Sequence, residues 1–302
     1  MASLIKITLI ISLIAQSPKQ LTALEKIKAC QAEFPTVKKA NCEQISNLIE
    51  KLVKTRENFG SWDLSNLNLS QIDLTDSNLQ NANFQNTHLD NVDFTNANLA
   101  KTQFSGILWG NNFTNANLRR AVIKGTITSN FTSADLSDAV LTRARVAEGT
   151  FKSANFTRAN LNSAKFESTN LDRASFVNAN LSSVQFTPHY GSDPGTSLIG
   201  VNFTNANLQK AIFGAYTNLE DSNFQGANLT NATFIKTENL TPTQVKSACN
   251  WEQAIYNFAS ERNPFPLQIT KADRLASQKY INNLKQDRAS DPRNPIDCDR
   301  WK

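Results

Sequence analysis

The chain has 302 residues, and its 31 Lys and Arg residues against 26 Asp and Glu residues give a formal net charge of +5. Eighteen Phe residues against one Met and four Trp indicate that one aromatic type fills one recurring position. Only two His residues are present, and they are far apart in the chain, which excludes a catalytic or metal centre built from several histidines.

The N-terminus has the layout of a secretory signal. Lys6 precedes an apolar run over residues 7–15, and polar residues follow at 16–18. A run of this length is too short to span a bilayer, so we expect residues 1–17 to be a signal peptide rather than an anchor. The mature chain is then exported and has no transmembrane anchor. The alternative is a buried N-terminal helix.

Residues 18–59 have helical spacing on both sides of Pro35. The apolar positions are Leu21, Leu24 and Ile27 before it, and Ile45, Leu48, Ile49 and Leu52 after it. Because Pro interrupts a helix, this pattern predicts a two-helix hairpin. We expect the hairpin to cover the first coil of the repeat region that follows, since an open solenoid end exposes an unpaired strand edge.

Residues 60–240 repeat with a period of five. Each unit has a small residue, an Asn or Asp, a large apolar residue and two polar residues. Two examples are Ala154-Asn155-Phe156-Thr157-Arg158 and Ala159-Asn160-Leu161-Asn162-Ser163. This period fits neither a helix, at about 3.6, nor a strand, at about 2, so the chain must turn in step with the repeat. The large and the small residue then point inward, which predicts a solenoid.

With these units, the chain resembles the pentapeptide-repeat protein family. The resemblance covers residues 60–240 and implies a mainly β fold, a right-handed quadrilateral β-helix with four units per coil. Roughly 33 units then make about eight coils, and at ~4.8 Å per strand the rod is ~38 Å long. We expect α-helical caps at both of its ends.

The repeat is irregular in three places. The spacing slips by one residue around Trp109, and it shortens to four between Ile123 and Phe131; we interpret both slips as bulges. Residues 187–197 interrupt the repeat with Pro and Gly pairs, which predicts a protruding loop. The candidate contact residues in these irregular segments are Trp109, His189 and Tyr190.

Residues 241–302 are expected to form a helical C-terminal cap and a tail. Thr241 is followed by a Pro and, three residues on, by Gln244, which predicts a capped helix start. The continuation to Tyr256 resembles the segment that closes the repeats in many cyanobacterial members of the family, and it favours a cyanobacterial origin. A second helix is expected from Thr270 to Arg288.

The four cysteines lie outside the repeats. Two of them are in the N-terminal hairpin and two in the C-terminal cap. With export, two disulfides are expected, and of the three possible connectivities the local one needs no link across the rod. The expected pairs are Cys30–Cys42 and Cys249–Cys298. Four reduced, buried thiols are the alternative if the chain stays in the cytosol.

The net positive charge comes from the two ends of the chain. Residues 60–240 carry 12 basic and 14 acidic side chains, so the rod is nearly neutral. Some members of the family resemble duplex DNA in shape and charge and bind DNA gyrase in its place, which requires a strongly acidic rod. A DNA-mimicking, gyrase-binding protein is therefore a disfavoured alternative here, and export would also oppose it.

Two sets of charged residues are expected to stack on neighbouring coils. Arg145 and Lys165 are one coil apart in equivalent positions, with Arg143 nearby, which predicts a small basic patch. Nucleic-acid binding is not expected, because the aromatic residues that would stack on bases point into the core. Asp73 and Asp93 are also one coil apart, ~5 Å, and are a weak candidate for a metal site.

No nucleophile with a base, phosphate-binding glycine loop or zinc spacing is found in the sequence. We therefore expect a noncatalytic, exported scaffold or protein-interaction module, without a cofactor, in the thylakoid lumen or the periplasm. A surface metal- or anion-binding protein is a further alternative. The protein partner, the oligomeric state and the physiological role do not follow from the sequence.

Overall fold

The computed structural model describes residues 48, 49, 51, 59–189, 194–257, 269–293 and 296–301. Several expectations fall outside these residues. They are the signal peptide at 1–17, nearly all of the hairpin expected at 18–59, the Cys30–Cys42 disulfide and the contact residue Tyr190. Of the hairpin, Leu48 and Ile49 are described as helical, and Ile49 is fully buried in the core.

Each five-residue unit forms one wall and one corner of a coil. At the corner, Ala154 N donates to Phe151 O over 3.0 Å, and Ser153 between them has φ 58°. A residue with positive φ recurs at nearly every corner, most often Asn or Ser, since short polar residues tolerate this conformation. The chain therefore turns once per unit, as the period of five predicts.

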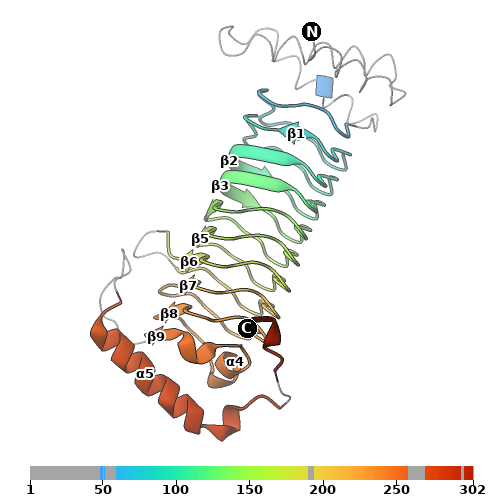
Figure 1. Ribbon diagram of the computed structural model, residues 1–302. Coiled ribbons are helices and arrows are strands. Elements are labelled where there is room, and N and C mark those ends of the chain that lie inside the picture. The colour runs from blue at the N-terminus through green and yellow to red at the C-terminus, as the bar shows by residue number, and fades with distance from the viewer. Residues whose placement is uncertain are drawn as a thin grey trace, which may run out of the picture.

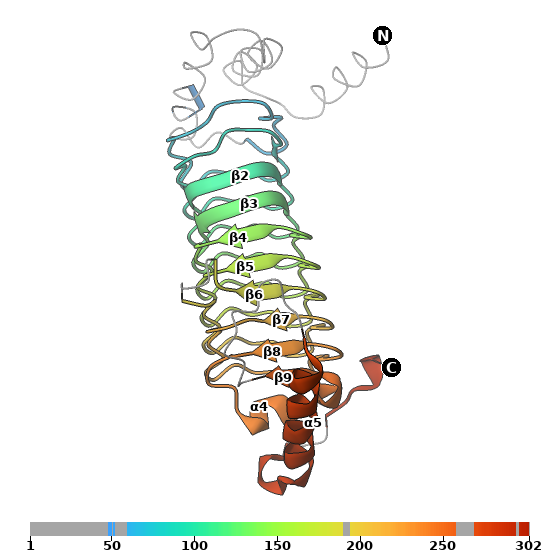
Figure 2. The same ribbon diagram turned by 90° about the vertical axis from the view of Figure 1, so that its left-hand side faces the viewer.

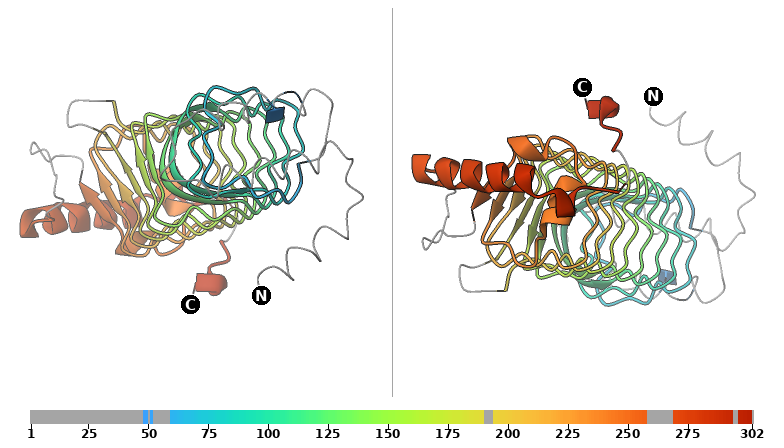
Figure 3. Two further views of the ribbon diagram at one scale, coloured as in Figure 1. Left: turned by 90° about the horizontal axis from the view of Figure 1, so that it is seen from above. Right: turned by 90° about the horizontal axis from the view of Figure 1, so that it is seen from below.

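Four successive units close one coil. Phe156, Leu161, Phe166 and Leu171 are each fully buried, and their units pair with Phe176, Leu181, Phe186 and Leu198 of the next coil. The expected convergence of these four side chains on one axis is thereby confirmed. We name the walls after the first four residues: the Phe156, Leu161, Phe166 and Leu171 walls. Figure 3 shows the coils stacked around a common axis.

One continuous parallel sheet runs along the rod, in the strand order β1 to β9 (Figures 1 and 2). Strands β4 to β9 lie on the Phe166 wall. The strand bounds are β1 Asn83–Phe84, β2 Gln103–Asn112, β3 Val122–Asn130, β4 Arg145–Ala147, β5 Lys165–Glu167, β6 Gln185–Thr187, β7 Ile212–Phe213, β8 Thr233–Ile235 and β9 Ile255–Asn257. The fold is a β-solenoid of about nine coils, one more than the repeat count predicts.

Stacked aromatic rings fill the interior. On the Leu171 wall, Phe131 lies 4.3 Å from Phe113 and 4.6 Å from Phe151 between ring centroids, with nearly parallel planes. On the Phe166 wall, Phe166 and Phe186 are 5.5 Å apart. Buried aromatic side chains contribute about 3–5 kcal/mol each by truncation to Ala. The Phe content of the chain therefore supplies a continuous core along a narrow rod.

The outward Asn and Asp residues hold the turns. Asn155 Oδ1 accepts from the backbone N–H of Thr157 over 3.0 Å, and its Nδ2 donates to Asp135 Oδ1 of the preceding coil over 3.1 Å. The same pattern recurs at Asn180 and Asn228. These columns satisfy turn backbones and link neighbouring coils.

The two slips in the repeat form the longest strands of the sheet. Units of four residues in β2 and β3 let each strand continue from the Leu161 wall through the corner onto the Phe166 wall. Gly106 and Gly125 occupy this corner at φ 101° and 118°, and they are register partners. The register shifts between Trp109 and Asn112. Only Gly adopts such φ values without strain, which explains its presence in both strands.

The rod continues beyond residue 240, where the sequence places the boundary. Helix α4 (Pro242–Lys246) begins with the expected capping box of Thr241 and Gln244. The expected helical cap therefore begins later than residue 241 suggests: after the short helix η1 (Trp251–Gln253), strand β9 pairs with β8 and adds one more coil.

Helix α5 (Lys271–Gln286) covers the edge of β9, as Figure 1 shows. Its Ser277 Oγ accepts from Tyr256 N over 2.9 Å, in the place where a further strand would bind. Asp273 Oδ1 accepts from Asn257 Nδ2 over 2.7 Å. The helix thus ends the sheet by satisfying its last backbone and side-chain donors.

The tail runs back along the rod. It contains helices η2 (Arg288–Ser290) and η3 (Asp299–Trp301). The expected disulfide Cys249–Cys298 is present, with its Cα atoms 5.6 Å apart. Trp301 Nε1 donates to Gly226 O over 2.8 Å. In the described part of the chain, no helix is both long and apolar enough to span a membrane.

Candidate functional site

The sequence-predicted contact residues lie around one wall. Trp109 in β2, Arg145 in β4 and Lys165 in β5 are on the Phe166 wall. Arg143 is at the corner before β4, and His189 follows β6 at the next corner of the same wall. The register places Arg145 directly beside Lys165, as the repeat predicts. These residues span five coils, so they form a surface rather than a compact site.

Two large apolar side chains project from this wall. Ile107 is 64% exposed and Trp109 is 53% exposed, while Leu108 between them is buried in the core. Alternate residues of a strand point to opposite faces, so a core residue here requires two outward neighbours. The sequence slip drew attention to Trp109, but it gave no reason to expect that Ile107 faces solvent.

Tyr216 adds a third exposed aromatic or apolar side chain, 46% exposed, at the corner that follows the Phe166 wall. In the described part of the chain, four large hydrophobic side chains are exposed, and only Leu275 lies elsewhere. An apolar side chain in water favours contact with a partner surface, and Trp, Tyr and Arg are enriched where such contacts are strongest.

Basic side chains lie at and beside the corner between the Leu161 wall and the Phe166 wall. Lys124 and Arg143 are at this corner and Lys165 is next to it on the Phe166 wall; all three are exposed and come from three successive coils. Adjacent strands are about 4.8 Å apart, so the three positions span roughly 10 Å along the rod. Within the described residues none of the three forms an ion pair. We call them the basic edge.

Arg145 is different from the basic edge, because its charge is balanced. Its Nη2 lies 2.7 Å from Glu167 Oε2, and its Nε donates to the same oxygen over 2.8 Å. The partner is on the neighbouring strand of the sheet. The charge of Arg145 is therefore partly balanced by Glu167, and its guanidinium contributes less to the electrostatic field of the surface than its position in the sequence suggests.

The base of the inserted loop is fixed to the preceding coils. His189 Nδ1 lies 2.7 Å from Glu148 Oε1, and His189 N donates to Ser168 Oγ over 2.8 Å. Ser168 Oγ in turn donates to Pro194 O over 2.9 Å, which ties both ends of the loop together. The sequence located the loop but not this contact, because Glu148 is 41 residues away from His189.

The weak metal candidates are engaged in their own turns. Asp73 and Asp93 are bridge partners on neighbouring coils, as expected. However, Asp73 Oδ1 accepts from Thr75 N over 3.0 Å, and Asp93 Oδ1 accepts from Thr95 N over 2.9 Å. Among the described residues, no group of three or more His, Cys, Asp or Glu side chains is arranged to hold a metal ion.

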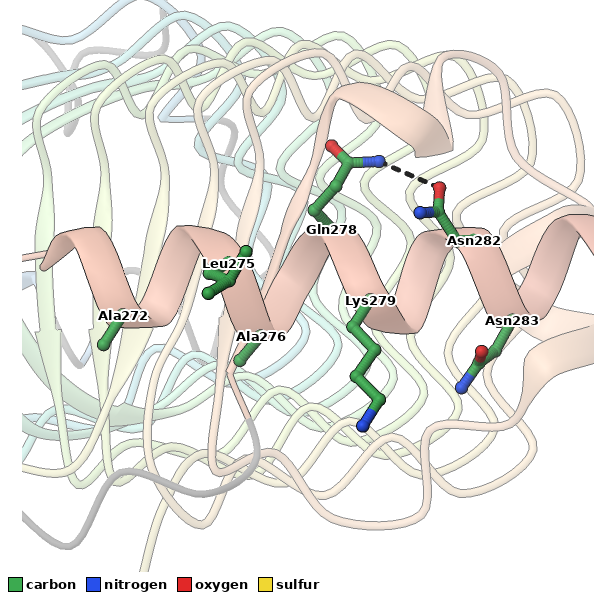
Figure 4. Close-up of a pocket in the computed structure, with 7 residues that line it drawn as sticks. All are labelled: Ala272, Leu275, Ala276, Gln278, Lys279, Asn282 and Asn283. Atoms are coloured by element: carbon green, nitrogen blue, oxygen red, sulfur yellow. Dashed lines mark hydrogen bonds between the residues drawn. The ribbon is translucent and has the colours of Figure 1, made fainter.

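A shallow hollow lies on the outer face of α5 (Figure 4). Its lining comes from one helix and includes Ala272, Leu275, Ala276 and Lys279. Gln278 Nε2 donates to Asn282 Oδ1 over 3.1 Å at one side of it. Lys279 is the single ionisable residue in this lining, so the hollow has no pair of groups for acid–base chemistry.

Shifted pKa values occur away from the basic edge. The hydrogen bond from Arg158 lowers the pKa of Asp138 at the corner between the Phe156 and Leu161 walls. Burial raises the pKa of Tyr256 well above its usual value, and it also raises the pKa of Tyr280. These groups belong to a surface ion pair and to the packing of the cap, so they have structural explanations.

Comparison with known proteins identifies the repeat. The model of pentapeptide repeats matches in eight copies, over residues 58–95, 72–108, 154–187, 194–214 and 215–240. The matches do not include residues 109–153, which contain the four-residue units between Ile123 and Phe131 and part of the basic edge. The sequence matches none of the curated proteins.

Several solved structures are similar to the chain. HetL, a pentapeptide repeat protein involved in heterocyst differentiation regulation from the cyanobacterium Nostoc sp. strain PCC 7120, has 24% identity and a TM-score of 0.41, covering 67% of this chain and 95% of its own. Trypsin-treated QnrB1, a plasmid-mediated fluoroquinolone resistance protein, has 19% identity and a TM-score of 0.37, with coverages of 57% and 82%. A pentapeptide repeat protein from the Arabidopsis thaliana thylakoid lumen has 26% identity and a TM-score of 0.18, with coverages of 34% and 66%.

Proposed function

Because the chain belongs to the pentapeptide-repeat family, we propose that it is a noncatalytic scaffold that binds another protein through its Phe166 wall. One observation carries this proposal. Ile107, Trp109 and Tyr216, three of the four large hydrophobic side chains exposed in the described chain, lie on this wall or at its corner.

The rigidity of the rod supports a binding role. Each strand from β2 to β8 is hydrogen-bonded to a neighbouring strand on both of its sides, so the backbone that carries the outward residues of the wall is fixed. The backbone of such a sheet is already ordered before a partner binds, so little of the binding free energy is lost to ordering the backbone. A flat, preorganised wall with Trp and Arg side chains is typical of a protein-binding surface.

Residues 104–131 give the wall features that the regular repeat lacks. The units of four carry Gly106 and Gly125 through the corner and project Ile107 and Trp109 outward. The position of Ile107 is occupied by a polar residue in the two preceding coils, Asn68 and His88. The exposed apolar side chains that distinguish this wall are therefore concentrated where the spacing of the repeat changes from five residues to four.

We also propose that the protein acts outside the cytosol, in the thylakoid lumen or the periplasm. The disulfide Cys249–Cys298 is consistent with an oxidising compartment, and residues 1–17 have the layout of a secretory signal. Fractionation of the source cell, with the chain detected by antibody in each compartment, tests this part. Recovery of the chain in the cytosolic fraction alone would contradict it.

The binding proposal is tested by affinity purification of the tagged chain from its own cells. Ile107→Ser with Trp109→Ser removes the apolar contact without changing charge, and we expect it to release the partner that copurifies with the wild type. The matched control is Val177→Ser, which changes a partly exposed apolar residue on the opposite Phe156 wall. Circular dichroism establishes that each variant is folded.

If the double variant retains the same partners in the same amounts as wild type, the Phe166 wall is not the binding surface. If the control releases them as well, the effect does not belong to this wall. Either result would refute the proposal as stated.

A further inference from the structure

The basic edge beside Ile107 and Trp109 has the composition of a binding site for carboxylates. Lys124 and Arg143 follow one another at this corner with no carboxylate beside them there, and Lys165 lies next to them on the Phe166 wall of the following coil. The corner between the Phe156 and Leu161 walls is different, because there Asp138 pairs with Arg158 over 2.7 Å. Neighbouring like charges repel each other in the free protein, so an anionic partner relieves that repulsion.

The apolar residues continue into the charged ones along the wall. The register runs from Ile107 to Thr126, then to Arg145 and to Lys165, one residue per strand from β2 to β5. At about 4.8 Å per strand, this column extends roughly 14 Å. A single polypeptide segment of a few residues therefore reaches the apolar part and the basic edge together.

The acidic residues around the basic edge favour a protein partner over a nucleic acid or an anionic membrane, whose phosphates form a continuous negative surface. Asp90 lies on the coil before Trp109, Glu148 lies at the far corner beside His189, and Glu167 lies on the wall. A duplex or an anionic lipid surface laid on the wall would bring its phosphates against these carboxylates. A protein segment can place its own carboxylates on the basic edge alone.

From these observations we infer that the partner presents an acidic segment with large apolar side chains, whose carboxylates bind Lys124, Arg143 and Lys165 and whose apolar groups pack on Ile107 and Trp109. The inference rests on the proposed function and names the chemistry of its partner.

Binding of a defined probe tests it directly. The probe is a fluorescein-labelled random copolymer of glutamate and tyrosine, titrated with the full chain at low salt and read by fluorescence anisotropy. The test variant combines Lys124→Gln, Arg143→Gln and Lys165→Gln. We expect it to bind the copolymer about tenfold more weakly, since each exposed charge contact is weak but the three act together. Trp109→Ser should weaken binding of the copolymer but not of polyglutamate.

A matched control removes three exposed cations elsewhere. Lys101→Gln, Lys152→Gln and Arg173→Gln take away the same number of Lys and Arg side chains from other walls and corners. This control should bind the copolymer like wild type. Equal weakening by the two triple variants would mean that only net charge matters, and it would overturn the inference.

Two further probes separate the sources of anionic groups. Duplex DNA, and phosphatidylcholine vesicles containing phosphatidylglycerol, are titrated under the same conditions. If the chain bound either the duplex or the vesicles more tightly than the copolymer, the natural partner would be a nucleic acid or a membrane surface rather than a protein segment. This result would refute the inference.

The same variants distinguish this inference from the proposed function. In the affinity purification, release of the native partner by Ile107→Ser with Trp109→Ser but not by the basic-edge variant would leave the proposed function standing and refute the acidic partner. Retention by both would refute both. Where the partner is retained by wild type, carbodiimide coupling should join Lys124 or Lys165 to an Asp or Glu of that protein.

Discussion

The approach of Gly125 to Gly106 predicts an unequal pair of alanine variants. A Cβ added at Gly106 meets no atom within 4 Å, so Gly106→Ala should lose stability only because Ala is strained at a φ of 101°. Residues held at such dihedrals cost roughly 1–3 kcal/mol. A Cβ at Gly125, at φ 118°, lies 1.9 Å from the carbonyl oxygen of Gly106. Backbone must then move, and overpacking adds about 1–3 kcal/mol, so Gly125→Ala should lose ~2–6 kcal/mol.

Guanidinium unfolding followed by circular dichroism measures the loss of stability in the two variants. Hydrogen exchange then shows whether protection is lost first in β2 and β3, as a local cause requires. Equal unfolding free energies for the two variants would refute the close approach of the strands, because the dihedral cost is similar at both positions. A loss spread evenly over the whole rod would contradict a local origin of the effect.

Three other perturbations test the core, the cap and the tail. Phe166→Ala should lower the unfolding free energy by ~3–5 kcal/mol, measured by denaturant titration, with exchange fastest in β4 to β6; a loss below about 1 kcal/mol would contradict the buried ring. Because burial raises the pKa of Tyr256, its contribution to stability is complete below pH ~10 and is lost as pH rises above that value. Tyr256→Phe should therefore reduce the alkaline loss of stability in a pH series of thermal melts, and an alkaline loss equal to that of wild type would contradict this expectation. Cys298→Ser opens a cross-link between residues 49 positions apart, for which chain entropy gives up to about 4 kcal/mol; limited proteolysis should cleave the tail first, and an unchanged digestion pattern would argue against its attachment.

The regular part of the rod could be predicted from the sequence, because the conformation of each five-residue unit is determined by the residues within that unit. Phe156 and Phe166 had to face inward once the chain turned every five residues, and both are fully buried. The adjacency of Arg145 and Lys165 follows from the same period. The capping box at Thr241 is equally local, since its two partners are three residues apart.

The features that the sequence did not determine depend on distant residues or on unusual dihedrals. The slip at Trp109 was visible, but the outward direction of Ile107 depends on how Gly106 carries the strand through the corner. Strand β9 has no repeat motif, and its place is set by pairing with β8 and by α5. The contact of His189 with Glu148 joins residues that are 41 positions apart in the sequence and two coils apart in the rod.

Ser277 occupies the hydrogen-bonding position that the next strand would take at the end of the stack. Each coil of this rod offers a template on which an identical coil can be laid, so an open end would let molecules join head to tail into fibrils. With α5 in place, another molecule cannot pair with β9 at this end, so the rod does not grow by head-to-tail association as the protein concentration rises.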